Sequence, residues 1–282
     1  MAPGLGKHYV PAAVHDAQPS GAGCIEGTPT QVLDEVMGLI VASDEPHLVW
    51  ISGMANSGKT SIALTLCQRL RNDPAVIFGG AFFCSCVANG PARMVVENIV
   101  PTLACLLVHT VPECARPLAG ELEDAGLVHM SIQAQVEGLL AKPLESLQSF
   151  DRPLVFIIDA LDQCSGRKQI VELLEAIVQF KVPAPVKFLV TTRPDLQIRM
   201  LNPSRCSRIE LHALDQKEDT ADIQPLLREN SAAWSNSARY TDADLHEFAK
   251  PADGRMVSAG VAPKCLPEVR SILICTFVSV WG

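Results

Sequence analysis

Nine consecutive residues have types and a spacing that suit phosphate binding: Gly53, Met54, Ala55, Asn56, Ser57, Gly58, Lys59, Thr60 and Ser61. The first eight match the pattern GxxxxGK[ST], in which glycines let backbone N–H groups turn inward toward phosphate oxygens. Lys59 supplies a cation for the β- and γ-phosphates, and the Thr60 hydroxyl is a ligand for Mg²⁺. A glycine-rich turn can match by chance. However, an apolar run precedes this loop and an amphipathic segment follows it, which favours nucleotide binding.

Two carboxylates follow a second apolar run, Leu154 to Ile158. Asp159 comes at the end of this predicted strand, and the carboxyl ends of parallel strands line the ligand crevice of α/β proteins. Asp159 therefore either holds Mg²⁺ or caps the next helix, and the phosphate loop upstream favours the metal. Asp162, three residues further on, either orients a water near the γ-phosphate or caps the following turn.

An arginine follows a third apolar run, Val186 to Thr191. Because Arg193 comes just after the end of this predicted strand, its guanidinium is placed to reach a γ-phosphate. The alternative is an ordinary pair with a surface carboxylate, which contributes little free energy. The setting favours the phosphate contact.

Strand-like and helix-like segments alternate along the chain. Buried strands are predicted at 48–51, 75–83, 153–158 and 186–191, with a further one at 207–211. Helices are predicted at 30–41, 59–71, 93–109 and 169–180, and Pro101 kinks or splits the third. This alternation predicts an α/β fold with a parallel sheet covered on both faces.

Composition divides the chain into four expected segments. Residues 1–23 are rich in Gly, Ala and Pro and predict a flexible tail. Residues 24–212 form the core, and 213–250 form a partial helical extension with short helices at 223–228 and 242–248. Residues 251–282 fit no clear pattern, so we expect an aberrant or poorly ordered end.

The overall composition narrows the class of protein. The 282 residues carry a net charge of −8, which argues against nucleic-acid and anionic membrane partners. A hydrophobic fraction of 48% with 19% charged residues excludes a mostly disordered chain. No apolar run reaches the ~18–20 residues of a membrane span, and no signal peptide is visible. The ten cysteines are therefore expected to be reduced thiols.

Taken together, these motifs resemble the NACHT domain of the STAND class of P-loop NTPases, most closely the nephrocystin-type module of fungal signalling proteins. The resemblance covers about residues 24–250. Its marks are CIEGTPTQVL at 24–33, WISG at 50–53, AFF at 81–83, DALDQC at 159–164 and TTRP at 191–194. It implies a three-layer α/β/α P-loop NTPase core with a small helical C-terminal extension. It also implies that the strand at 186–191 lies between the strands at 48–51 and 153–158.

The resemblance also implies roles for the candidate residues. The nine loop residues would hold ATP or ADP, Thr60 and Asp159 would hold Mg²⁺, and Asp162 and Arg193 would serve catalysis. The implied protein is a cytoplasmic, nucleotide-dependent signalling switch of the type used in nonself recognition and cell death. Its implied partners are other copies of itself or signalling proteins.

Two departures from the family pattern bear on activity. Gln163 stands where the family usually has Glu, and an amide can orient water but cannot accept a proton, so weak or absent Mg-dependent ATPase activity is expected. Cys84-Ser85-Cys86 stands where the family usually has an Arg after the Phe-Phe strand.

Two other functions remain open. One is a non-catalytic interaction module whose nucleotide is structural. The other is a P-loop small-molecule kinase, for which basic residues of a lid are available: Arg199, Arg205 and Arg208.

Overall fold

The computed structural model describes residues 5, 7–14, 30–42, 46–54, 57–84, 91–122, 126–146, 151–182, 185–194 and 204–211. The chain divides into two compact units, and the first contains nearly all of these residues, as far as Glu210. Of the second unit, the structure describes Met54, Ser57, Gly58 and Leu211. The segments predicted at 213–250 and 251–282 lie outside the described residues.

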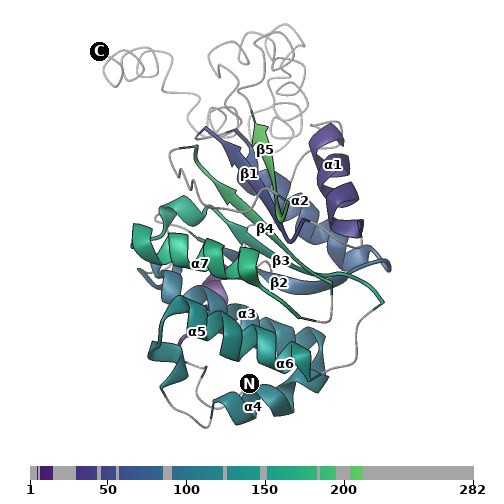
Figure 1. Ribbon diagram of the computed structural model, residues 1–282. Coiled ribbons are helices and arrows are strands. Elements are labelled where there is room, and N and C mark those ends of the chain that lie inside the picture. Colours follow the sequence, from purple (N-terminus) through teal and green to yellow (C-terminus); the bar gives the residue numbers. More distant parts are fainter. Residues whose placement is uncertain are drawn as a thin grey trace, which may run out of the picture. The chain divides into compact units, whose positions relative to one another are not determined.

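Within the described residues, five strands form one sheet in the order β2-β3-β4-β1-β5 (Figure 1). Their bounds are Leu48–Gly53 (β1), Ile77–Phe83 (β2), Leu154–Asp159 (β3), Val186–Thr192 (β4) and Cys206–Leu211 (β5). The pairs β2–β3, β3–β4 and β4–β1 are parallel. The five predicted strands are therefore present, and β4 lies between β1 and β3 as the resemblance implies.

The three central strands are apolar for a physical reason. Every residue of β1, β3 and β4 is buried, because helices cover both faces of a parallel sheet. Successive side chains point to opposite faces. Trp50, Phe156 and Phe188 belong to the large core on one face, where the two phenylalanine rings stack with centroids 5.4 Å apart.

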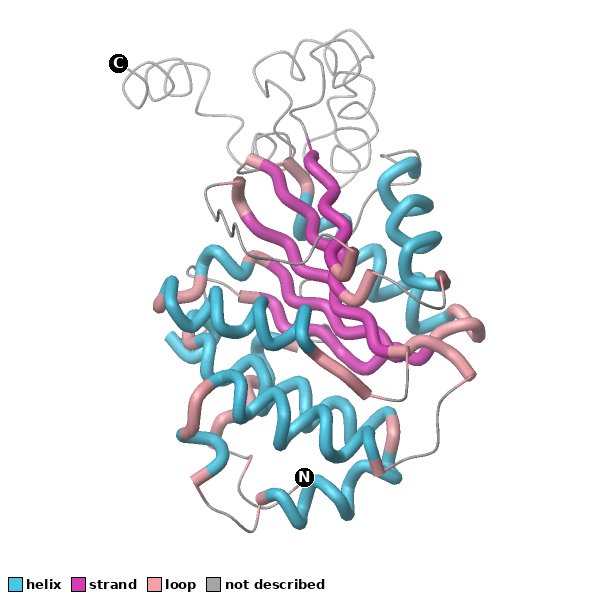
Figure 2. The backbone as a smooth tube through the Cα atoms, viewed as in Figure 1, coloured by secondary structure: helices cyan, strands magenta, loops and turns pink. Residues whose placement is uncertain are grey.

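Seven α-helices are described: Thr30–Val41 (α1), Lys59–Asn72 (α2), Ile99–Thr110 (α3), Ala115–Glu121 (α4), Ile132–Val136 (α5), Lys142–Glu145 (α6) and Arg167–Gln179 (α7). Short turns join them: Pro11–Ala13 (η1), Pro91–Met94 (η3), Val96–Asn98 (η4), Pro112–Cys114 (η5), Leu127–His129 (η6), the π-turn Glu137–Ala141 (η7) and Leu161–Gln163 (η8). Figures 1 and 2 show α1 and α2 on one face of the sheet and α7 on the other, with α3 and α5 below α7. This confirms the three-layer α/β/α core.

The segment 7–14 differs from the flexible tail predicted for residues 1–23. Val10 and Ala13, together with Leu5, are buried in the core. The backbone N–H of Val10 donates to Thr102 Oγ1 at 3.2 Å, and the same hydroxyl donates to the carbonyl of His8 at 3.3 Å. Three spaced apolar residues therefore anchor a stretch whose composition alone predicts a tail. Apart from these residues, the range 1–23 lies outside the described part of the chain.

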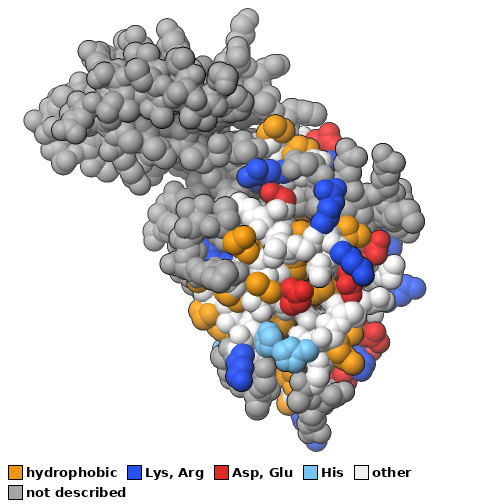
Figure 3. All heavy atoms as spheres, turned by 90° about the vertical axis from the view of Figure 1, so that its left-hand side faces the viewer, with side chains coloured by type: hydrophobic (Ala, Val, Ile, Leu, Met, Phe, Trp, Pro, Cys, Tyr) orange, Lys and Arg blue, Asp and Glu red, His pale blue; other side chains and the backbone are white. Residues whose placement is uncertain are grey.

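No helix in the described ranges is both long and apolar enough to cross a bilayer. On the face in Figure 3, acidic, basic and apolar side chains are interspersed.

The backbone conformation at position 80 requires a glycine. Its φ of 136° lies in a region that L-residues rarely adopt, and a Cβ there would lie 2.6 Å from Leu106 Cδ1. By contrast, a Cβ at Gly38 in α1 would meet nothing within 4 Å.

We expect Gly80→Ala to lower the free energy of unfolding by about 2–4 kcal/mol, since backbone strain and overpacking add. The matched variant Gly38→Ala should raise it by about 0.5–1 kcal/mol, because alanine favours a helix over glycine. Urea unfolding of both variants checks this. Equal midpoints for the two variants would contradict the close packing of β2 against α3.

Candidate functional site

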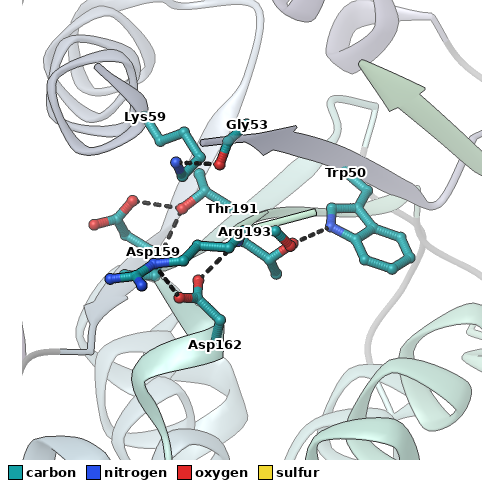
Figure 4. Close-up of polar contacts among 9 residues, drawn as sticks. Trp50, Gly53, Lys59, Asp159, Asp162, Thr191 and Arg193 are labelled. Atoms are coloured by element: carbon teal, nitrogen blue, oxygen red, sulfur yellow. Dashed lines mark hydrogen bonds and ion pairs between the residues drawn. The ribbon is translucent and has the colours of Figure 1, made fainter. Parts of the chain in front are cut away.

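The phosphate loop joins β1 to α2. β1 ends at Gly53, α2 begins at Lys59, and Gly58 has a left-handed φ of 81° that glycine permits. The Lys59 Nζ donates to the Gly53 carbonyl at 2.6 Å (Figure 4). Lys59, Thr60 and the positive end of α2 therefore lie at the carboxyl edge of the sheet, where a phosphate group would be attracted. Ala55 and Asn56 lie outside the described residues.

The Asp159 carboxylate connects three elements at this edge. It is the last residue of β3, and its side chain is buried. Thr60 Oγ1 donates to Asp159 Oδ2 at 2.8 Å, and Thr191 Oγ1, on β4, donates to Asp159 Oδ1 at 2.6 Å. Burial raises the pKa of this carboxyl, and the hydrogen bonds from Thr191 and Thr60 lower it in part. The two residues predicted to hold the metal, Thr60 and Asp159, are thus in direct contact.

These oxygens fit Mg²⁺ chemically. Mg²⁺ prefers hard oxygen ligands and binds proteins through one or two side chains, with phosphate oxygens and water in the remaining positions. Thr60 and Asp159 match that donor set. Within the described ranges, no group of three or more His, Cys, Asp or Glu side chains lies close enough together to hold a metal ion.

The backbone just after Asp159 is strained. Ala160 has a φ of 54°, and among the described residues it is the one non-glycine residue with a positive φ. Its N–H donates to Thr191 Oγ1 at 2.8 Å, which helps to hold the turn. Such outliers persist where the surroundings fix them, often at functional sites. Thr191 therefore holds both Asp159 and the turn that follows, a role that sequence reasoning did not assign although it placed a Thr-Thr pair at this strand end.

Asp162 and Arg193 lie together beside Asp159. The backbone N–H of Arg193 donates to Asp162 Oδ1 at 3.0 Å, and Arg193 Nε lies 3.3 Å from Asp162 Oδ2 (Figure 4). Both carboxylate oxygens of Asp162 thus contact Arg193. The side chain of Arg193 is half exposed and that of Asp162 is 13% exposed, so the guanidinium faces the open side.

A polar chain fixes the backbone that carries Arg193. Trp50 Nε1 donates to Thr192 Oγ1 at 2.8 Å, and that hydroxyl donates to the Arg193 carbonyl at 2.9 Å. The guanidinium of Arg208, on β5, stacks over the Trp50 ring with Cζ 5.1 Å from the centroid. The tryptophan before the phosphate loop therefore positions the end of β4.

Two of the basic residues considered for a kinase lid make other contacts. Arg208 covers Trp50 and also lies 3.3 Å from Glu210. Arg205 donates to the Phe180 carbonyl at 2.8 Å. Arg199 lies outside the described residues. These contacts link β5 and the residue before it to the end of α7 and to β1.

Arg93 is a further basic residue at this edge that sequence reasoning missed. It comes from η3, is buried, and its Nε donates to the Phe83 carbonyl at the end of β2 at 2.9 Å. Burial lowers the pKa of Arg93, while Cys84 and Asp159 act to raise it. An arginine thus reaches the end of the Phe-Phe strand from ten residues away, and sequence spacing alone gives no signal for this.

Solved structures of low sequence identity are similar to this chain. Among solved structures, Cdc6p from Pyrobaculum aerophilum has a TM-score of 0.52 at 14% identity over 89% of this chain and 64% of its own. A STAND protein with a tetratricopeptide repeat sensor from Pyrococcus horikoshii has a TM-score of 0.46 at 12% identity, over 97% of this chain and 35% of its own. PCH-2 from C. elegans has a TM-score of 0.47 at 14% identity, over 95% and 66%. This chain thus spans less than two thirds of Cdc6p, whose likeness shows the fold alone.

The sequence itself identifies the family. The family model described as Nephrocystin 3, N-terminal matches residues 32–193, which is more than half of the chain. No curated protein matches the chain. The chain belongs to the nephrocystin-3 N-terminal family, and the matched range runs from α1 to Arg193.

We expect Asp159→Asn to raise the free energy of unfolding of the nucleotide-free protein near pH ~7. Because the pKa of Asp159 is raised above its ordinary 3.8, the folded state binds this proton more tightly than the unfolded chain does. The wild-type stability contributed by this carboxyl therefore falls as pH rises through the interval between 3.8 and the raised pKa.

Urea unfolding across this pH range measures the difference between wild type and Asp159→Asn. The gain should shrink toward pH ~3, where both side chains are neutral. Asp34→Asn, at an exposed carboxylate on α1, is the matched control and should change stability by less than about 0.5 kcal/mol. A loss of stability in Asp159→Asn at neutral pH would mean that the carboxylate is held mainly for the fold.

Proposed function

We propose that this chain is a NACHT-type nucleotide-binding module that binds ATP or ADP with Mg²⁺ and acts as a slow signalling switch. The observation that carries the proposal is the contact between Thr60 and the buried Asp159 beside Lys59. A buried carboxylate raises the energy of the fold unless a partner compensates it. A phosphate-bound cation at this edge supplies such a partner.

Each residue has a distinct part in the proposed binding. Lys59 transfers its Nζ from the Gly53 carbonyl to phosphate oxygens, so an internal hydrogen bond is exchanged for a charge-assisted one. The loop amides and the start of α2 bind the same anion. Thr60 and Asp159 hold Mg²⁺, which, when bound, neutralises charge on the β- and γ-phosphates.

Hydrolysis depends on the pair Asp162–Arg193. While Arg193 contacts both oxygens of Asp162, this carboxylate is occupied. A γ-phosphate competes for the guanidinium, and Asp162 is then able to orient a water. Gln163 follows directly and cannot accept a proton, so the proposed turnover is slow or absent. The same two features support the alternative, a non-catalytic module whose nucleotide is structural.

The wider role follows from the family resemblance. We propose a cytoplasmic protein that associates with other copies or with signalling proteins, of the type used in nonself recognition and cell death. A small-molecule kinase is less well supported, because two of the arginines that its lid would use make other contacts. Arg205 donates to the carbonyl of Phe180 at the end of α7, and Arg208 stacks on Trp50.

The first experiment is to denature the purified protein, identify released nucleotide by chromatography, and assay phosphate release with Mg-ATP. Bound ADP with slow turnover supports the switch. Bound nucleotide without turnover or exchange supports the structural alternative. Phosphoryl transfer to a small-molecule acceptor would support the kinase instead.

Lys59→Ala should weaken nucleotide affinity by roughly tenfold or more, since a charge-assisted phosphate contact of ~1.5–3 kcal/mol is lost. Titration calorimetry with Mg-ADP and Mg-ATP measures this. Lys142→Ala, which removes an exposed lysine paired with Glu121, should bind as wild type does. Unchanged affinity in Lys59→Ala would refute the phosphate-loop assignment.

Arg193→Ala should reduce the affinity for Mg-ATP by about tenfold and that for Mg-ADP by less than about twofold, since only the triphosphate offers the γ-group. The matched control is Arg69→Ala, which removes another partly exposed arginine paired with an aspartate. Equal losses for both nucleotides would show that Arg193 acts through the fold rather than through the γ-phosphate.

A further inference from the structure

Two cysteines that are 80 positions apart in the sequence meet beside the proposed nucleotide site. Cys84 follows the last residue of β2, and Cys164 follows η8. Their Sγ atoms are 3.1 Å apart, with the Cys164 thiol donating to Cys84. Both side chains are buried and both thiols are free. The gap exceeds a disulfide bond of ~2.05 Å by only about 1 Å.

Backbone contacts hold both cysteines in this arrangement. The N–H of Cys84 donates to the Asp159 carbonyl at 3.0 Å, which continues the pairing of β2 with β3. On the other side, the N–H of Ser165 donates to the Met94 carbonyl at 2.8 Å, and Cys164 Sγ lies 3.8 Å from the Arg93 carbonyl. Main-chain contacts therefore fix the backbone at Cys84 and next to Cys164.

We propose that Cys84 and Cys164 form a reversible modification site, at which an intramolecular disulfide is made by exchange with a small-molecule disulfide such as oxidised glutathione. Nothing in the nucleotide chemistry proposed above uses these thiols. Disulfides that form in reducing compartments are usually transient and respond to the redox state.

The chemistry balances in two steps. The Cys164 thiol loses its proton, its sulfur attacks one sulfur of the small disulfide, and one small thiolate leaves with a proton. The Cys84 thiol then loses its proton and its sulfur attacks Cys164 Sγ in the mixed disulfide, and the second small thiolate leaves and takes up that proton as a thiol. Two protein thiols are oxidised to one disulfide, and the small disulfide is reduced to two thiols.

Cys164 reacts first because it lies nearer to solvent. It is 8% exposed against 4% for Cys84, and Ser165 and Gly166 after it are exposed. A local opening of this turn is enough to reveal its sulfur, whereas Cys84 continues the sheet edge.

The bond would fix the segment that carries Asp162. η8 is held at Asp162 by Arg193, and the disulfide would hold its other end, at Cys164, to the end of β2. Residues 160–165 would then be anchored on both sides. That this restrains the proposed nucleotide cycle rests on the proposed function, but the bond itself does not.

The test uses the folded, nucleotide-free protein incubated with oxidised glutathione and then blocked with N-ethylmaleimide in acid. Chymotrypsin cuts after Phe83 and Leu161 and separates the two cysteines onto different peptides. Mass spectrometry should find these peptides joined, with the loss of two hydrogens, and a reductant should release them. Absence of the joined peptides after prolonged incubation overturns the proposal whether or not the protein binds nucleotide.

Variants identify the sulfurs involved. Cys84→Ala and Cys164→Ala should each abolish the joined peptides, while Cys105→Ala, at another buried free thiol, should retain them. Cys86 shares a peptide with Cys84, so Cys86→Ala must also retain them. Joined peptides that survive Cys84→Ala and vanish in Cys86→Ala overturn the assignment. The wild-type result stands even if one variant does not fold.

Hydrogen exchange tests the restraint directly and without nucleotide. Amides of residues 160–166 should exchange at least about tenfold more slowly in the oxidised protein, because opening η8 must now displace β2 as well. Amides of α1, on the other face of the sheet, are the internal control. Unchanged exchange in 160–166 would overturn the claim that the bond holds Asp162 in place.

Discussion

The arrangement of the site depends on one buried carboxylate and the two hydroxyls that donate to it. Asp159 ends β3, Thr191 lies on β4, and Thr60 lies in the first turn of α2. These three residues meet at one edge of the sheet, because β4 pairs with both β1 and β3 and the loop after β1 reaches the end of β3 across this single strand. The strand order therefore brings Thr60 within hydrogen-bond distance of Asp159.

The Asp159 carboxylate also sets the stability of the empty protein against the proposed function. The buried charge that would bind a cation destabilises the fold when no cation is bound. Burial raises the pKa of Asp159, which means that the fold holds its charge at an energetic cost that two neutral hydroxyl donors offset only in part. The strained backbone of Ala160, directly after it, adds a second local cost. A bound cation would offset the cost of burying the Asp159 charge and would account for the strained turn at Ala160. Sites of this kind are tuned for a ligand rather than for the stability of the empty protein.

Sequence reasoning predicted the parts of the structure that depend on local patterns. The β-branched apolar runs gave the central strands, and the proline in the predicted helix at 93–109 marked its division, since α3 begins at Ile99 with Pro101 in its first turn. The parts it missed depend on contacts between distant segments. The composition of the N-terminal segment gave no indication that Thr102 anchors Val10. The spacing of Phe83 and Arg93 in the sequence likewise did not predict their hydrogen bond. For the same reason, Thr191 was recognised as part of a motif but not as the donor to Asp159.

A chain of polar contacts links the two candidate catalytic residues to β1. Trp50 on β1 holds Thr192, which holds the Arg193 backbone, and Arg193 in turn contacts Asp162 in η8. A ligand that takes the half-exposed Arg193 guanidinium would therefore release Asp162 Oδ2. The Arg193 backbone would stay in place, because its carbonyl accepts from Thr192 and its N–H still donates to Asp162 Oδ1. An ion pair of this exposure contributes little free energy. A phosphate group that binds the Arg193 guanidinium would therefore replace this ion pair at small cost, and η8 would lose the contact that it makes through Asp162 Oδ2.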